Sequence, residues 1–172
     1  MITEQEMENY PSIKQIIYYF QELDKIPRSS KNEEQVVKFL INFAEERNLD
    51  YYTDDANNII IVKKGTDNSD NYLAFQSHID MVCEKSVKSN HDFSKDPIDL
   101  NINGDYIKSN ETSIGADNGI GVAYMLTILD SNDLIHPNIE MIFTSDEESS
   151  MTGAKEIDLS IIKSKRIISL DA

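Results

Sequence analysis

The stretch Thr112-Ser113-Ile114-Gly115-Ala116-Asp117-Asn118-Gly119-Ile120-Gly121, with the apolar run 122–129 after it, decides how this chain folds. Apolar side chains in the run recur at positions Val122, Met125, Leu126 and Leu129. This i, i+3, i+4, i+7 spacing predicts a helix packed on a core. Asp117 lies at the predicted start of that helix, where unpaired N–H groups favour its ionised form by roughly 0.3–1 kcal/mol. Taken alone, Asp117 could simply be a helix-capping residue.

The composition excludes two classes of partner. The chain has 172 residues, the length of a single domain, and a formal net charge of -15 from 31 acidic and 16 basic residues. This balance leaves no broad basic surface to neutralise phosphate groups, so we expect no nucleic-acid partner and no membrane partner.

The start of the chain and its cysteine content predict a cytoplasmic location. No apolar run approaches the ~20 residues of a membrane span, and Met1 leads into an acidic, polar segment rather than a signal peptide. The single cysteine, Cys83, allows no internal disulfide, which agrees with a reducing compartment.

Two amphipathic helices are predicted in the first third of the chain. Apolar residues recur at helical spacing over 13–23, and Ile26-Pro27 ends this helix. Ser30 followed by Glu33 has the form of a capping box, which predicts the start of a second helix with its apolar face over 36–44. We interpret both helices as scaffold.

From residue 49 onward the apolar pattern becomes that of β-strands. Strands are predicted at 49–53, 59–62, 72–77, 98–102, 105–109, 139–144 and 166–170. The turn cluster 54–58 makes a hairpin of the first two, and Asn103-Gly104 makes another of the fourth and fifth. Strands alternating with helices in this way predict an open α/β sheet.

The strand 72–77 leads directly into His78-Ile79-Asp80. In an extended chain a His and an Asp two residues apart point to the same side, so Asp80 could hold one ring nitrogen while the other binds a metal. A structural histidine bonded to a nearby Asp explains the pair equally well. Cys83 could likewise be a thiolate ligand or an inert buried thiol.

Carboxylates follow two further strands. Asp146-Glu147-Glu148 comes after the strand 139–144, and Asp171 comes after 166–170. Consecutive carboxylates repel one another and need a cation, a helix N-terminus or water, so a solvated acidic loop is the simple alternative. Because ligands bind at the carboxyl ends of strands in an open α/β sheet, we expect these side chains to meet His78 there.

One histidine with several carboxylates suits a pair of divalent ions such as zinc, manganese or cobalt. Two such ions, ~3.5–4 Å apart, activate a water and polarise a carbonyl or phosphoryl oxygen. The residues alone therefore predict a dinuclear metal site and leave its substrate open.

Four motifs, in this order and spacing, resemble the M20 family of dinuclear zinc peptidases. They are His78-x-Asp80, Gly115-Ala116-Asp117-Asn118-Gly119, Asp146-Glu147-Glu148 with Met151-Thr152-Gly153-Ala154, and Leu170-Asp171. Within the family the chain is most similar to the aminoacyl-histidine dipeptidases, also called Xaa-His dipeptidases or peptidase D. The segments His91-Asp92-Phe93 and Lys95-Asp96-Pro97-Ile98 also resemble that subgroup.

This resemblance implies that four residues hold two zinc ions, for which cobalt or manganese could substitute. His78 would bind one ion, and Asp117 would bridge both. Glu148 would bind the second ion and Asp171 the first. The family also has a cis peptide after the bridging aspartate, here between Asp117 and Asn118.

The resemblance implies roles for two further carboxylates. Asp80 would orient His78. Glu147 would be the general base, which takes a proton from the water between the ions and passes it to the leaving amine. The implied activity is that of a metallo-dipeptidase, a hydrolase that cleaves dipeptides, with Xaa-His as the expected substrate.

The resemblance also predicts the fold and the extent of the chain. Residues 1–172 would be the N-terminal part of a three-layer αβα catalytic domain with a mixed, mostly parallel sheet, incomplete at its C-terminus. In the family, a second-zinc histidine and a lid domain with dimer and substrate contacts follow the equivalent of Asp171. We therefore expect a fragment with little or no activity, from a parent that binds short peptides and forms a homodimer through the lid.

Two other functions remain open at this stage. The parent could be another M20-type amidohydrolase or aminopeptidase with a different substrate. It could also be a non-catalytic acidic binding module that retains the fold.

Overall fold

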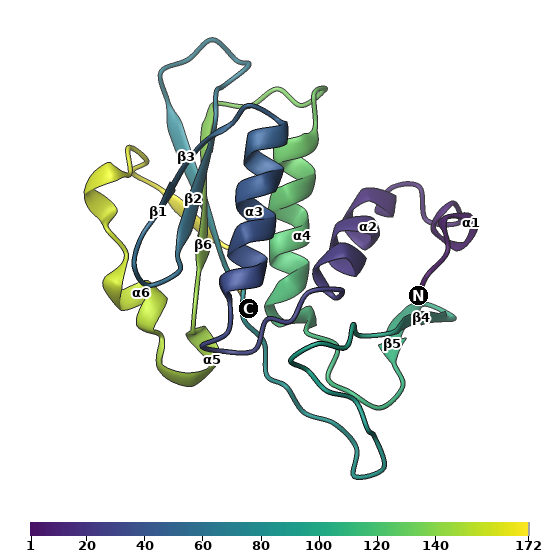
Figure 1. Ribbon diagram of the computed structural model, residues 1–172. Helices are drawn as coiled ribbons and strands as arrows, with labels where there is room; N and C mark the ends of the chain where they lie inside the picture. Colours follow the sequence, from purple (N-terminus) through teal and green to yellow (C-terminus); the bar gives the residue numbers. More distant parts are fainter. Residues whose placement is uncertain (172) are drawn as a thin grey trace.

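The structure is a computed structural model that describes residues 1–171. A five-stranded sheet lies at its centre (Figure 1). The helices are α1 (Glu4–Met7), α2 (Lys14–Leu23), α3 (Glu34–Glu46), α4 (Ala116–Asp130), α5 (Glu147–Ser150), α6 (Thr152–Glu156) and the 3-10 helix η1 (Leu159–Ile161). The strands are β1 (Asp50–Thr53), β2 (Ile59–Lys63), β3 (Tyr72–His78), β4 (Leu100–Asn103), β5 (Tyr106–Ser109), β6 (Asn138–Thr144) and β7 (Ile167–Ser169).

The sheet is mixed, with strand order β1-β2-β6-β3-β7. β1, β2 and β6 pair antiparallel, whereas β6, β3 and β7 run parallel. His78 at the end of β3 pairs in register with Thr144 at the end of β6. The chain therefore leaves both strands at the same edge of the sheet, and the segments 78–80 and 145–148 start side by side.

Helices cover one face of the sheet. In Figure 1, α3 and α4 lie to the right of the strands, and α2 packs against α4 farther out. Alternate residues of β2 and β6 supply the buried side chains under these helices: Ile59, Ile61, Ile139, Met141 and Phe143. The period of two follows from the pleat of a strand, which sends successive side chains to opposite faces.

The intervening residues build a smaller core on the other face. It consists of Ile60, Ala74 and Ile142, with Val62, Ile157 and Ile162 packed against them. Since Ile157 and Ile162 flank η1, the segment after α6 forms the third layer. The predicted three-layer α/β architecture is confirmed.

β7 forms one edge of the sheet and is open to solvent along its whole length. Its apolar side chains Ile167 and Ile168 are both exposed. β4 and β5 form a separate two-stranded sheet beside α1 and α2 in Figure 1.

Every predicted strand is found, with ends shifted by two residues at most. The two predicted N-terminal helices are also found, as α2 and α3. The short helices α1 and α5 were not predicted, because four residues are too few to display a helical period.

The capping-box prediction for Ser30 and Glu33 is wrong. α3 begins one residue after Glu33, whose own backbone is the N-cap, and among the described residues no side chain caps this helix. The two side chains point elsewhere, toward the ends of β3 and β6.

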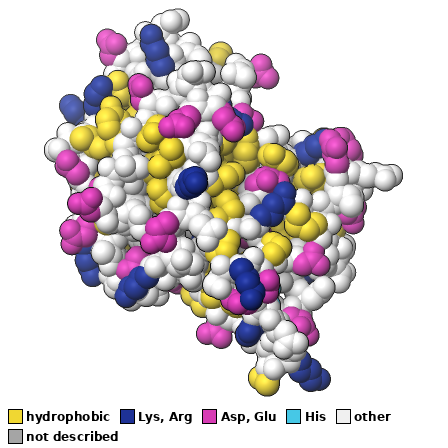
Figure 2. All heavy atoms as spheres, viewed as in Figure 1, with side chains coloured by type: hydrophobic (Ala, Val, Ile, Leu, Met, Phe, Trp, Pro, Cys, Tyr) yellow, Lys and Arg dark blue, Asp and Glu magenta, His cyan; other side chains and the backbone are white. Residues whose placement is uncertain are grey.

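The surface is acidic, in keeping with the net charge. On the face seen in Figure 2, Asp and Glu side chains are spread over the surface with Lys and Arg among them. Within residues 1–171, no helix combines the length and the apolar character that crossing a membrane requires.

The ion pair of Arg28 and Asp24 lies inside this framework. The Arg28 guanidinium donates to Asp24 Oδ1 at 3.0 Å, and both side chains are buried. Burial raises the pKa of Asp24 to about 6, against the opposing attraction of Arg28. The pair ties the end of α2 to the segment that leads into α3.

We expect Asp24→Asn to lower the free energy of unfolding by about 3–5 kcal/mol, because it leaves the buried Arg28 charge without its counter-ion. Urea unfolding measures the loss. Lys25→Gln, which breaks the partly exposed Lys25–Glu22 pair, is the control, with an expected change below about 1 kcal/mol. Equal losses in the two variants would contradict the role assigned to burial.

Candidate metal centre

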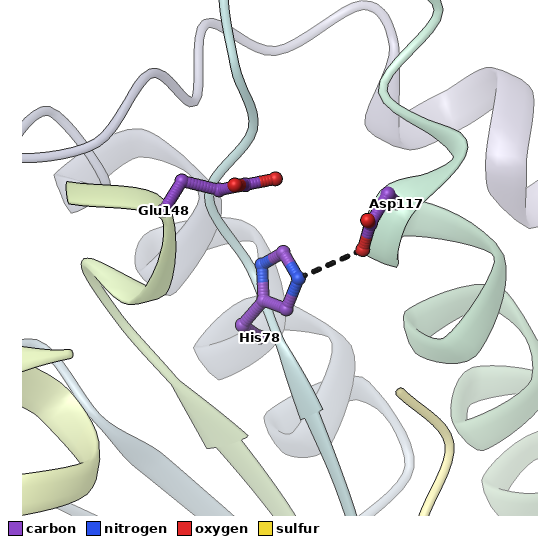
Figure 3. A group of neighbouring side chains, drawn as sticks. All are labelled: His78, Asp117 and Glu148. Carbon is purple, nitrogen blue, oxygen red and sulfur yellow. Dashed lines mark hydrogen bonds and ion pairs between the residues drawn. The ribbon is translucent and has the colours of Figure 1, made fainter. Parts of the chain in front are cut away.

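Three side chains converge at the edge of the sheet where β3 and β6 end. His78, Asp117 and Glu148 each offer a ligand atom, and these atoms all lie within 4.8 Å of one another. Figure 3 shows that His78 comes from the end of β3, Asp117 from the start of α4 and Glu148 from α5. Segments separated by up to 70 residues in sequence thus contribute to one site.

His78 is held at both ring nitrogens. Its side chain is 1% exposed, and Nε2 lies 3.0 Å from Asp117 Oδ1. Nδ1 lies 3.2 Å from the backbone oxygen of Asp80 and 3.3 Å from its Oδ1. Burial opposes the charged form, but hydrogen bonds to Asp80 and Asp117 outweigh it and raise the pKa of His78 to about 9. The ring therefore presents Nε2 toward the shared space of the three side chains.

Asp80 is the buried centre of the hydrogen bonds around the site. Its carboxylate accepts from Ser30 Oγ at 2.7 Å and from the backbone N–H groups of Glu147 at 3.0 Å and Glu148 at 3.1 Å. Burial would raise the pKa of Asp80, but these donors and His78 hold it below the usual value. One carboxylate thus fixes the histidine and the first turn of α5 together.

The acidic run 146–148 divides into two parts. Asp146 is buried, has a positive φ of 47°, and accepts from the hydroxyls of Ser149, Ser150 and Thr152. Glu147 is half-buried and Glu148 is exposed. Partial desolvation by neighbouring groups raises the pKa of Glu148, and the nearby Asp117 carboxylate adds to this effect. Residues 146–148 therefore form an ordered turn that presents Glu147 and Glu148, and not the solvated acidic loop that was the simple alternative.

Asp117 stands at the start of α4 but is not its capping residue. The N-cap is Gly115, with a left-handed φ of 66°. Asp117 and Asn118 are non-helical, and the peptide between them is cis, as the resemblance implied. The Asp117 side chain is 71% exposed, so the site faces an open edge of the described residues.

Asp171 lies next to this group and not within it. It lines a cavity of about 250 Å³ together with Asp117 and Leu170, and its charge contributes to the raised pKa of His78. Of the predicted ligands, the structure brings together His78, Asp117 and Glu148 and places Asp171 at the same edge.

The donor set fits a divalent metal ion. One imidazole and two carboxylates are ligands that zinc accepts in proteins, and Asp80 lies against the other ring nitrogen, where it orients a ligating histidine. His78 Nε2 and Asp117 Oδ1, now hydrogen-bonded to each other, would both turn to a bound cation.

Two residues around the site were missed by sequence reasoning. Ser30 and Glu33 were assigned to a helix cap, yet both bond to the ligand-bearing segments. No local pattern distinguishes a helix cap from bonds to the ligand-bearing segments, because the partners of Ser30 and Glu33 are 50 and 113 residues away.

The fold and this site define a class of proteins. The model of Peptidase family M28 matches residues 58–167, which is more than half of the chain. The chain belongs to this peptidase family. The finer assignment to the M20 family stays a prediction.

Individual relatives and solved structures that are similar to this chain are named as peptidases. The chain is 34% identical to the cytosol non-specific dipeptidase of Escherichia coli (strain K12), over 89% of this chain and 32% of that protein. The structure matches the aminoacylhistidine dipeptidase of Vibrio alginolyticus with a TM-score of 0.90 at 34% identity, over 94% of this chain and 33% of that one. A tripeptidase of Staphylococcus aureus matches with a TM-score of 0.78 at 26% identity, over 100% of this chain and 44% of that one.

The predicted similarity to aminoacyl-histidine dipeptidases is therefore confirmed. The chain spans about a third of the length of the dipeptidases that it matches.

We expect Gly115→Ala to destabilise the protein more than Gly104→Ala. Both glycines have a positive φ, which costs an alanine about 1–2 kcal/mol. A Cβ on Gly115 would also lie 2.3 Å from Arg28 Nη2 and 2.6 Å from Met81 Sδ, whereas nothing lies within 4 Å of one on Gly104. This overpacking adds about 1–3 kcal/mol. Urea unfolding of both variants measures the difference, and equal losses would contradict the crowding at Gly115.

Proposed function

We propose that the protein to which this chain belongs hydrolyses short peptides with the help of bound metal ions, with Xaa-His dipeptides as the expected substrate. The observation that carries the proposal is the convergence of His78, Asp117 and Glu148 at the carboxyl edge of the sheet. The relatives named dipeptidase and tripeptidase support peptides as the substrate class.

In this proposal His78, Asp117, Glu148 and Asp171 hold two zinc ions, with cobalt or manganese as substitutes. Asp117 would contribute to holding both ions, as the resemblance implies; its carboxylate is exposed and lies 3.0 Å from His78 Nε2. The bound ions supply Lewis acidity, which lowers the pKa of a water and polarises the scissile carbonyl. Asp80 keeps His78 in the tautomer that presents Nε2.

Glu147 acts as the general base. It lies beside the ligand Glu148 in the first turn of α5, and its backbone N–H is fixed by Asp80. Its carboxylate takes a proton from the attacking water and delivers it to the leaving amine. A half-buried side chain on an anchored helical turn suits this task, because its backbone is fixed and its carboxylate is still open to a substrate.

Residues 1–172 are, in this proposal, the N-terminal part of the catalytic domain. The short share of the dipeptidases that the chain covers supports this division. The remaining ligand, the substrate-binding lid and the contacts of a homodimer would then come from other parts of the protein. The isolated chain would have little or no activity, and the protein would act in the cytoplasm.

Glu147→Gln in the full-length protein is expected to lower kcat for Xaa-His hydrolysis by about 10²–10⁴-fold, because the amide cannot accept the proton. Zinc binding should persist, since Glu147 is not a ligand in this proposal. Glu156→Gln, an exposed change in α6, is the control and should leave kcat unchanged. Full activity in Glu147→Gln would sink the proposed role of Glu147.

A panel of substrates separates the proposal from the alternatives. Cleavage of other amides in place of Xaa-His would indicate another amidohydrolase or aminopeptidase that uses the same site. A zinc-loaded wild type that cleaves neither peptides nor other amides would leave the non-catalytic acidic binding module.

Removal of metal with a chelator should abolish hydrolysis, and zinc or cobalt should restore it. Asp117→Asn should weaken zinc binding more than about tenfold, because even loss of an outer-shell partner costs about 10–100-fold. Calorimetric titration with zinc measures the affinity of the wild type and of Asp117→Asn. Unchanged affinity in Asp117→Asn would remove Asp117 from the ligand set.

A further inference from the structure

The connection between α2 and α3, from Arg28 to Glu33, contacts every segment that carries a predicted ligand of the cluster. In Figure 1 it runs along the end of the sheet where α5 and the start of α4 lie. Its sequence pattern predicts only the end of one helix and the cap of the next. Its long-range hydrogen bonds reach residues 50 to 113 positions away in sequence.

Arg28 joins this connection to the segments of His78 and Asp117. Its side chain is buried and donates to the backbone oxygen of Gly115 at 2.8 Å and to that of Ile79 at 3.4 Å. Its own backbone oxygen accepts from the N–H of Met81 at 3.0 Å. One residue thus holds the turn before Asp117 and both sides of Asp80.

Ser30 and Glu33 join the connection to the carboxylates. Ser30 Oγ donates to Asp80 Oδ2 at 2.7 Å. Glu33 is 1% exposed, and its Oε1 accepts from the backbone N–H of Asp146 at 3.0 Å and of Lys31 at 2.8 Å. The N–H of Asp146 precedes Glu147 and Glu148 directly, at a residue with a positive φ.

Three buried carboxylates meet at this point. Glu33, Asp80 and Asp146 each bring an oxygen within 4.8 Å of the others. Each has its own donors: backbone N–H groups for Glu33, Ser30 and the start of α5 for Asp80, and hydroxyls for Asp146. Because like charges repel and buried acceptors need partners, such a group persists only with these bonds made. The donors explain the group fully, so we do not assign it an ion.

We propose that Glu33 is a positioning residue for the metal centre, acting with Ser30: its Oε1 fixes the turn at Asp146 and thereby places Glu148 beside His78. The inference rests on the proposed function for its kinetic consequence. Its structural content, the placement of the Glu148 ligand, does not depend on which substrate is cleaved.

The essential property of Glu33 is its acceptor oxygen. A glutamine retains that oxygen in the same place, and its amide adds a donor beside Asp80 and Asp146. A methionine has a similar length and fills the same space without an acceptor. The pair Glu33→Gln and Glu33→Met therefore separates hydrogen bonding from packing.

The test uses the full-length protein loaded with Zn²⁺ or Co²⁺. We expect Glu33→Met to lower kcat and the affinity for Zn²⁺ by about 10–100-fold, with little change in KM, because a partner of the ligand segment is lost. Glu33→Gln should restore both values to within a few-fold of wild type. The visible spectrum of the Co²⁺-loaded protein should shift in Glu33→Met and match wild type in Glu33→Gln.

Glu34→Met and Glu34→Gln are the matched controls, since Glu34 is the next residue and is exposed at the start of α3. They should leave kcat, Zn²⁺ affinity and the Co²⁺ spectrum unchanged. If Glu33→Met fails to fold, Ser30→Ala is the variant to use. This smaller change removes the hydroxyl that donates to Asp80, and it should alter the same three quantities in the same direction.

Two results would overturn the inference. One is a folded Glu33→Met whose Zn²⁺ affinity, Co²⁺ spectrum and kcat equal those of wild type. The other is an equal defect in Glu33→Gln, which would show that the acceptor is not what matters. A wild type that binds Zn²⁺ but cleaves no peptide would defeat the proposed function alone, and the Zn²⁺ and Co²⁺ measurements would still decide the role of Glu33.

Discussion

The rest of the site depends on one buried anion, the Asp80 carboxylate. It neighbours the imidazole of His78 and accepts the first two N–H groups of α5. A helix N-terminus is a favourable place for a negative charge, because its unpaired N–H groups point toward it. The bonds to Asp80 therefore stabilise the start of a helix too short to persist alone, and they tie that helix to the strand that carries the histidine.

The parallel pairing of β3 with β6 makes this arrangement possible. Their register ends both strands at the same level, so the residues that follow them start a few ångströms apart. α4 begins at this same edge, where it presents Asp117, and carries the chain to the opposite end of the sheet, from which β6 starts. The topology of a parallel sheet thus gathers distant segments, and buried hydrogen bonds set their final positions.

Much of the fold was predictable because its signals are local. The apolar runs of β2 and β6 and the helical period of 122–129 each occupy one continuous stretch. The ligand positions His78, Asp117 and Glu148 were predicted from motif order, and the structure brings them together. Contacts such as Glu33 with Asp146 were not predictable, since nothing in either segment encodes its partner 113 residues away. The pattern Ser-x-x-Glu is moreover shared by helix caps and by this connection.

The open edge at β7 has a consequence for the behaviour of the chain in solution. An edge strand with exposed apolar side chains is a template for pairing with a second chain. Two features oppose this association: β7 has only three residues, and each chain carries a net charge of -15 that repels another copy. Salt screens that repulsion and leaves the apolar edge unchanged, so the chain is best kept dispersed at low ionic strength.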